Sequence, residues 1–112
     1  MKKINRIVDN RDFSSTIKTG HFEKNNTYRV YWLENSLGYT RIGIAASTKM
    51  GNAVIRSTIR RRLRAISDSL LDYSACSLDI VIMPKNLFLE QNYQTNLVEL
   101  ENIFNKFVRT KK

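Results

Sequence analysis

A long run of residues with helical periodicity, between positions 53 and 71, constrains this chain more than any other feature of its sequence. Apolar side chains recur there every three or four positions, which is the spacing of one side of an α-helix. The residues of this apolar stripe are Ile55, Ile59, Leu63, Ile66 and Leu70. Asn52 directly precedes the run and is suited to cap the helix. Because a helix with one apolar side must pack on another layer, the chain has to build a core around it.

The segments around this helix supply the other layer. Strands are predicted from β-branched and aromatic residues, and helices from apolar spacing and from end signals such as Asp9, Asn10 and Gly20. In chain order we expect a helix over 9–18, an edge strand over 21–24, strands over 27–34 and 39–47, the long helix over 53–71, a buried strand over 78–83 and a last helix over 92–109. Residues 1–8 are expected to form an extended basic arm. This order predicts one α+β domain, residues 1–112, with helices on a mostly antiparallel sheet.

Two of the predicted strands have faces of contrasting character, because successive side chains of a strand point to opposite faces. The first face of strand 27–34 carries Tyr28, Val30 and Trp32, and the second carries Arg29, Tyr31 and Leu33. The first face of strand 39–47 carries Ile42, Ile44 and Ala46, and the second carries Gly43, Ala45 and Ser47. The small side chains on that second face leave room for another group to approach.

The charge of the chain is concentrated around the long helix. Nineteen Lys and Arg residues stand against ten Asp and Glu, a net charge of +9, which favours a polyanionic partner. Seven basic residues fall between positions 41 and 64 without an acidic residue among them. They are Arg41, Lys49, Arg56, Arg60, Arg61, Arg62 and Arg64.

The spacing of these arginines indicates a phosphate-binding surface. Arg56, Arg60 and Arg64 are four residues apart, so they lie on one side of the helix, about 100° from the apolar stripe. A helix face that is merely solvated usually mixes both signs of charge, and a planar guanidinium binds phosphate through two hydrogen bonds. We therefore favour phosphate over a solvated face. An anionic membrane is less favoured, because the helix carries no exposed Trp or Phe to enter it.

Several kinds of site are excluded by composition. Cys76 and His21 are the only cysteine and histidine, too few for a disulfide framework or a structural zinc centre. No paired acidic motif suggests a protein catalytic centre. We expect no secretory signal and no membrane span, which would need about 18 consecutive apolar residues. A cytoplasmic protein is therefore expected.

A known family has a signature similar to the residues at the start of the long helix. The bacterial ribonuclease P protein subunit carries that signature, which here reads Ser47-Thr48-Lys49-Met50-Gly51-Asn52-Ala53-Val54-Ile55-Arg56, then Ile59-Arg60-Arg61 and Arg64. The Gly-Asn-Ala-Val core is intact, whereas the family's central Arg-Asn-Arg reads Arg56-Ser57-Thr58. The N-terminal stretch of the family resembles Lys2-Lys3, Asn5-Arg6, Asp12-Phe13 and Gly20. The resemblance covers nearly the whole chain.

This resemblance implies a fold and two RNA-binding surfaces. The fold would be an αβββαβα sandwich with a four-stranded mixed sheet and a left-handed βαβ crossover, similar to the second domain of a small-subunit ribosomal protein. The surface facing the catalytic RNA would comprise Lys49, Asn52, Arg56, Ser57, Arg60, Arg61 and Arg64. A cleft for the single-stranded 5′ leader of precursor tRNA would contain Phe13, Ile17 and Tyr31, with Arg29 on the face of Tyr31. Aromatic residues beside basic ones suit single-stranded RNA, although Phe13 and Tyr31 would also suit ordinary core packing.

The function implied is that of a subunit of an endoribonuclease, a hydrolase that leaves a 5′-phosphate on mature tRNA. The catalytic RNA would do the chemistry with Mg²⁺ held mainly by RNA, and this chain would bind the leader, lower the metal requirement and hold no cofactor itself. Its partners would be the catalytic RNA and precursor tRNA, and no membrane. Two alternatives stay open, a structural RNA-binding protein of ribosomal type and a nuclease that acts without RNA.

Overall fold

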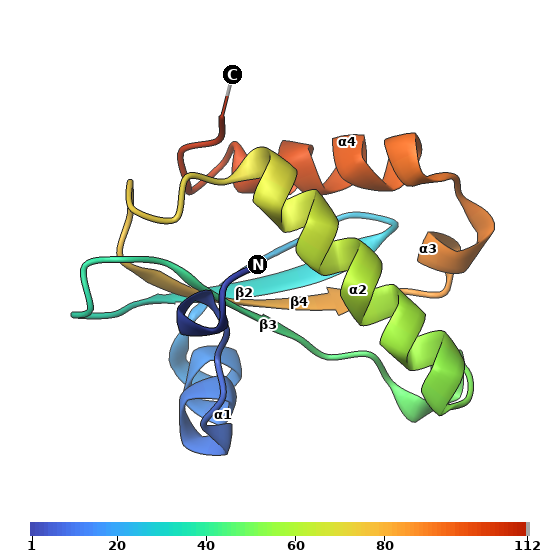
Figure 1. The fold of residues 1–112 in the computed structure, drawn as a ribbon, viewed down its shortest axis with the longest axis horizontal. Helices are drawn as coiled ribbons and strands as arrows, with labels where there is room; N and C mark the ends of the chain where they lie inside the picture. Colours follow the sequence, from blue (N-terminus) through green and yellow to red (C-terminus); the bar gives the residue numbers. More distant parts are fainter. Residues whose placement is uncertain (112) are drawn as a thin grey trace.

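The computed structural model describes residues 1–111 and confirms the predicted α+β class (Figure 1). Helices α2 and α4 cover one face of a single four-stranded sheet, and α1 lies on the other face (Figure 1). The elements in chain order are η1 (Lys3–Asn5), α1 (Asn10–Thr19), β1 (His21–Lys24), β2 (Tyr28–Glu34), β3 (Arg41–Ile44), η2 (Thr48–Met50), α2 (Ala53–Leu70), β4 (Leu78–Pro84), α3 (Leu87–Glu90) and α4 (Tyr93–Phe104). Lys112, the last residue of the expected domain 1–112, lies outside the described residues.

The sheet is mixed, with strand order β1-β2-β4-β3. Strand β2 pairs antiparallel with β1 and with β4, whereas β3 pairs in parallel with β4. Helix α2 connects that parallel pair. Seen from the α2 side with both strands pointing upward, β4 lies to the left of β3, so the crossover is left-handed (Figure 1). The family resemblance implies this hand, whereas general experience with parallel strands would favour the opposite one.

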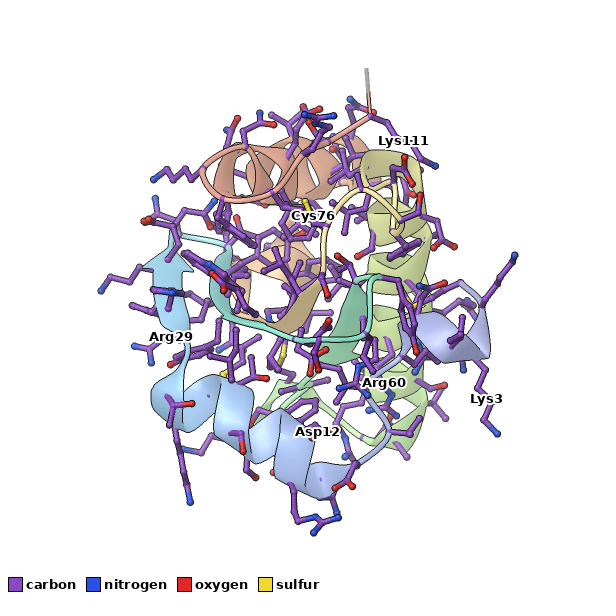
Figure 2. The ribbon with its side chains drawn as sticks, turned by 90° about the vertical axis from the view of Figure 1, so that its left-hand side faces the viewer. Lys3, Asp12, Arg29, Arg60, Cys76 and Lys111 are labelled. Atoms are coloured by element: carbon purple, nitrogen blue, oxygen red, sulfur yellow. The ribbon has the colours of Figure 1, made fainter. Side chains whose placement is uncertain are left out.

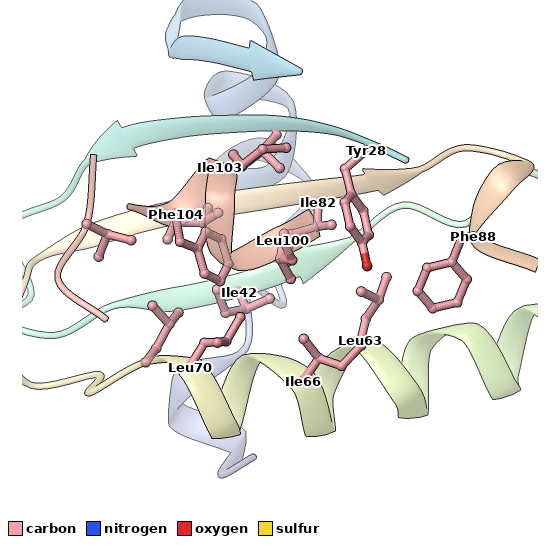
Figure 3. Packing of buried hydrophobic residues seen from close by; sticks show 14 of the residues in the cluster. Tyr28, Ile42, Leu63, Ile66, Leu70, Ile82, Phe88, Leu100, Ile103 and Phe104 are labelled. Carbon is pink, nitrogen blue, oxygen red and sulfur yellow. The ribbon is translucent and has the colours of Figure 1, made fainter. Parts of the chain in front are cut away.

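The hydrophobic core lies between the sheet and the two helices α2 and α4 (Figure 3). Every residue of the apolar stripe of α2 except Ile55 is buried, and Ile55 is 39% exposed near the start of the helix. The sheet contributes the face predicted for β2 and β3, including Tyr28, Val30 and Ile42, all at most 3% exposed. Strand β4 is buried on both faces along most of its length. It is therefore the centre of the sheet's packing.

The elements differ from the sequence-based expectation at β3, directly after β4 and at the end of the last helix. Strand β3 spans only Arg41–Ile44, and a short helix α3, absent from the prediction, follows β4. The last helix ends at Phe104 rather than near residue 109. Beyond Phe104 the chain turns, and Phe107 stacks on Trp32 with ring centroids 3.8 Å apart and nearly parallel planes.

The N-terminal segment is not a simple extended arm. Residues Lys3–Asn5 form a 3-10 turn, and Arg6 forms a parallel bridge to Ile42 of β3. The buried side chain of Asn5 donates from Nδ2 to the carbonyl oxygen of Thr40, 3.0 Å away. The segment is held against β3 because buried polar groups need hydrogen-bond partners. This places Arg6 in a defined position.

An ion network fixes α1 against one end of the sheet. Arg41 donates from Nε and Nη2 to the two carboxylate oxygens of Asp79, at 2.8 and 2.6 Å, and from Nη2 to Asp12 of α1 at 3.2 Å. The side chains of Arg41 and Asp79 are 14% and 9% exposed. Asp79 raises the pKa of Arg41 through these hydrogen bonds, so the guanidinium stays charged. Removal of one partner from a charge pair this well buried strongly destabilises the folded chain.

We predict that Asp79→Asn lowers the free energy of unfolding by about 3 kcal/mol, because it leaves the charge of Arg41 buried without its main carboxylate. Urea denaturation would measure the loss. Glu23→Gln is a matched control, because it breaks an exposed ion pair with Lys106, 3.3 Å long, and should cost less than about 1 kcal/mol. The double change Arg41→Met with Asp79→Leu should recover most of the loss. Equal losses for Asp79→Asn and Glu23→Gln would contradict this account.

Candidate functional site

The basic side of α2 is built by the same helix that builds the core. Arg56, Arg60 and Arg64 are partly exposed and Arg61 is exposed, and we call these four residues the arginine arc. At about 100° per residue the arc lies on one side of the apolar stripe, with Ser57 exposed within it. Arg62 lies on the other side of the stripe. The predicted cationic face is therefore a continuous surface along one side of the helix.

The loop before α2 sets where the arc begins. The side chain of Asn52 accepts a hydrogen bond from the backbone N–H of Ile55 at 3.0 Å, so it caps the helix as its sequence position predicts. Gly51 has a φ of 149° and lies against the side chain of Ile55, where a Cβ would meet it at 2.8 Å. Glycine therefore suits both the backbone and the space at this position. Lys49 is exposed in η2, directly before the arc.

Arg6 joins the arginine arc, and sequence periodicity could not have shown this. The pKa of Arg64 is lowered by its burial and by the nearby charges of Arg6 and Arg60. A polar pocket of about 400 Å³ lies at this junction. Its lining residues are Met1, Arg6, Ser57, Arg61, Arg64, Ala65 and Asp68. Asp68 accepts from the amino group of Met1 at 2.6 Å, so the arginines around the pocket are left facing solvent with like charges close together.

Two of the seven basic residues between positions 41 and 64 do not belong to this surface: Arg62, on the other side of the apolar stripe, and Arg41. Arg41 lies on the far face of the sheet and is neutralised by Asp79. Within residues 1–111, none of the other six forms an ion pair with a carboxylate. They are Lys49, Arg56, Arg60, Arg61, Arg62 and Arg64. An unneutralised row of guanidinium groups is suited to bind phosphate.

The residues predicted for a leader cleft lie on the outer face of the sheet, the face that α1 partly covers. Phe13 of α1 lies against Gly43, where a Cβ would be only 2.6 Å from its ring. The room predicted beside the small residues of β3 is thus filled by Phe13. Ile17 is also partly buried, whereas Arg29 on β2 is exposed and Tyr31 partly exposed. Figure 2 shows Arg29 at the strand edge, well separated from Arg60 of the arginine arc.

The outer face has opposite electrostatic character at its two ends. A cavity of about 570 Å³ lies where α1 meets the ends of β2 and β4, and its lining includes the carboxylates of Asp12, Glu34 and Asp79. The other end carries Arg29, directly opposite Lys24 of β1. Phe22 of β1, which the sequence did not single out, is 42% exposed there. A phosphate chain on this face would be attracted to the Arg29 end and repelled from the acidic one.

The single histidine of the sequence lies apart from the arginine arc, on strand β1. This residue, His21, packs beside Trp32 with ring centroids 5.4 Å apart and ring planes inclined by 30°. Among residues 1–111 no three His, Cys, Asp or Glu side chains come together to hold a metal ion. The same residues contain no helix that is both long and apolar enough to cross a membrane. The arrangement can bind and orient a polyanion.

A small α+β domain with an arginine-lined helix and an aromatic, partly basic sheet face defines a nucleic-acid-binding protein. Comparison with known proteins narrows this class. The family model described as Ribonuclease P matches residues 1–108. The chain therefore belongs to the ribonuclease P protein family, for which a role in processing the 5′ leader of precursor tRNA is expected.

Relatives with similar sequences extend over almost the full chain. The ribonuclease P protein component of Mesoplasma florum is 33% identical over 110 residues, which cover 97% of this chain and 100% of that protein. The ribonuclease P protein component of Bacillus cereus is 33% identical over 107 residues, covering 95% and 93% of the two chains. The residues that the family model matches, 1–108, span both the N-terminal segment and the arginine arc.

Solved structures share the fold. A mutant of the Staphylococcus aureus RNase P protein with defective mRNA degradation activity superposes with a TM-score of 0.81 at 28% identity, covering 93% of this chain and 88% of that one. The RNase P protein of Thermotoga maritima superposes with a TM-score of 0.79 at 25% identity, covering 91% and 96%. The mixed sheet with its helices is thus the fold of the family.

We predict that Arg60→Ala and Arg64→Ala each weaken binding of the chain to bacterial ribonuclease P RNA. Each change should also flatten the slope of log affinity against log salt by about one unit, because one phosphate contact and its released counterion are lost. Filter binding over a range of KCl concentrations would measure both effects. Arg62→Ala is the matched control on the other side of the apolar stripe and should leave the slope nearly unchanged. A control slope that falls as far as that of Arg60→Ala would contradict the proposed arc.

Proposed function

We propose that this chain assists a catalytic RNA in the endonucleolytic removal of the 5′ leader from precursor tRNA. The observation that carries the proposal is the arginine arc, which lies beside Arg6 and has no carboxylate paired to it among residues 1–111. Membership of the ribonuclease P protein family supports the same reading. In this proposal the arc and Lys49 contact the catalytic RNA. A cytoplasmic location belongs to the proposal, since precursor tRNA is the substrate.

The chemistry is assigned to the RNA in this proposal. Among residues 1–111 no three His, Cys, Asp or Glu side chains gather to hold a metal ion, and the arginine arc repels cations. Mg²⁺ would be held by RNA and would supply the activated water. The protein would neutralise phosphates that otherwise repel one another, which lowers the concentration of Mg²⁺ that the complex needs.

The leader is assigned to the outer face of the sheet. Tyr31 and Arg29 lie on one face of β2, and Phe13 and Ile17 of α1 border that face. Stacking on an aromatic ring and pairing of phosphate with arginine are the two interactions that bind single-stranded RNA without reading its sequence. The acidic cavity at the far end of the same face directs the phosphates toward Arg29. Precursor tRNA is therefore proposed as the second RNA partner.

We predict that the purified chain alone does not cleave precursor tRNA, and that it raises cleavage by a bacterial ribonuclease P RNA at low Mg²⁺. Gel analysis of 5′-labelled precursor tRNA would measure the products. Cleavage by the protein alone would instead indicate a nuclease that needs no RNA. Binding to RNA without any rise in cleavage would indicate a structural RNA-binding protein of ribosomal type. Arg62→Ala is the control variant, and it should raise cleavage by the RNA as much as the unchanged chain does.

We also predict that Tyr31→Ala weakens binding of precursor tRNA by the protein–RNA complex, while mature tRNA binds as before. The stacked base contributes about 1–3 kcal/mol by alanine substitution, so the loss should be at least about fivefold. Tyr31→Phe keeps the ring and should retain most of the affinity. Circular dichroism would check that the fold is retained. An equal loss with mature tRNA would show that Tyr31 acts through packing rather than through the leader.

A further inference from the structure

The outer face of the β1–β2 hairpin carries two aromatic and two cationic side chains close together. We call Phe22, Lys24, Arg29 and Tyr31 the edge platform. We propose that the edge platform extends the leader-binding surface, with Phe22 as an additional base-stacking residue at the edge strand of the sheet. This proposal rests on the proposed function, because it adds a contact to the leader assigned above. Its occupant is single-stranded RNA, through one unpaired base and its phosphate.

The strand register brings these side chains together. Phe22 lies directly opposite Tyr31, and Lys24 lies directly opposite Arg29, so all four share one face. The rings of Phe22 and Tyr31 are 4.9 Å apart between centroids and inclined by 36°. The guanidinium carbon of Arg29 lies 5.6 Å from the centre of the Phe22 ring. This cation–π contact holds the charge of Arg29 beside the aromatic pair.

The fold itself has little use for an aromatic ring at Phe22. The opposite face of the same hairpin already contributes to packing, through Val30, which is fully buried, and through Trp32 stacked on Phe107. Phe22 is not part of that cluster and leaves 42% of its surface in water. A cross-strand pair with Tyr31 stabilises the hairpin by less than about 1 kcal/mol. An exposed ring on an edge strand is otherwise an association hazard.

The charges around Phe22 match an RNA backbone. Within residues 1–111 neither Lys24 nor Arg29 forms an ion pair with a carboxylate. Glu23, between Phe22 and Lys24 on β1, points to the opposite face and pairs with Lys106. A base stacked on Phe22 would therefore have two free cations within reach of its phosphate. Single-stranded RNA uses this combination of an aromatic surface and adjacent positive charge.

The strand order predicts which nucleotides reach the edge platform. Strand β3 and η2, with Lys49, lie toward the arginine arc, and β1 is the strand furthest from them. A leader that enters from the side of the catalytic RNA passes β2 before β1. Tyr31 would then contact nucleotides nearer the cleavage site, and Phe22 would contact the nucleotides after them. The effect of Phe22 should consequently depend on leader length.

The test compares precursor tRNAs whose leaders are lengthened one nucleotide at a time, bound to the complex of this chain with bacterial ribonuclease P RNA. For Phe22→Ala we expect affinity to equal that of the unchanged chain with short leaders and to fall at least about fivefold once the leader reaches the edge. Phe22→Tyr keeps the ring and should restore affinity. Tyr93→Ala is the matched control, since Tyr93 is similarly exposed at 45% but lies on α4.

Two results would overturn the proposal, and neither depends on whether Tyr31 contacts the leader. One is an affinity for Phe22→Ala equal to the unchanged chain at every leader length. The other is an equal loss at every length, mature tRNA included, which would make Phe22 a packing residue. Phe22→Leu separates folding from stacking, because it keeps an apolar side chain at the edge but has no ring. Loss for Phe22→Leu with long leaders only, at unchanged unfolding free energy, would support the platform.

A leader effect at Phe22 without one at Tyr31 would support base stacking on Phe22 and remove Tyr31 from the proposed leader site. A leader effect at Tyr31 without one at Phe22 would do the reverse. The two proposals therefore fail separately.

Discussion

Helix α2 meets two opposed physical requirements along the same 18 residues. Its apolar side packs Ile59, Leu63, Ile66 and Leu70 into the core, each at most 3% exposed, and burial of such a side chain contributes about 1.5–3 kcal/mol. Its neighbouring side carries arginines four residues apart, and each like-charged pair costs a few tenths of a kcal/mol. Packing therefore outweighs repulsion by a wide margin. The helix can keep a cationic surface whose one neighbouring carboxylate, Asp68, is paired with the amino group of Met1. In the proposed function that surface binds RNA.

The sheet separates the proposed leader-binding surface, on its outer face, from the arginine arc on α2. Because β4 is buried on both faces, α1 must cover part of the outer face, and the ion network of Arg41 holds α1 at one end. That network neutralises Arg41 and leaves the carboxylates of Asp12 and Asp79 at the same end. The free cations of the outer face are consequently at the opposite end, around Arg29. The contact that orients α1 thus also gives the outer face its electrostatic direction.

The parts of this fold that follow local rules could be predicted from the sequence. The apolar stripe and cap of α2 and the alternation of β2 are properties of short segments. Pairing between distant residues could not be predicted in this way: Arg41 reads as one more basic residue until Asp79 is found beside it. The stacking of Phe107 on Trp32 likewise joins distant segments, and helical spacing alone does not predict it. Of the candidate RNA-binding residues, the arginine arc followed from helical spacing, whereas Arg6 and Phe22 needed the register of neighbouring strands.

The segment η2 connects the two proposed RNA-binding surfaces over a short distance. It follows β3 and precedes α2, with Lys49 exposed between the outer face and the arginine arc. Its ends are constrained, since Ala45 donates its N–H to Ile82 of β4 at 2.9 Å and Asn52 caps α2. In the proposed function, a connection held at both ends would fix the direction of a bound leader relative to a bound catalytic RNA. Alignment of two reactants can lower a barrier by several kcal/mol without a catalytic side chain. In the proposed function, alignment of this kind would let the chain raise the rate of a reaction whose chemistry is assigned to RNA.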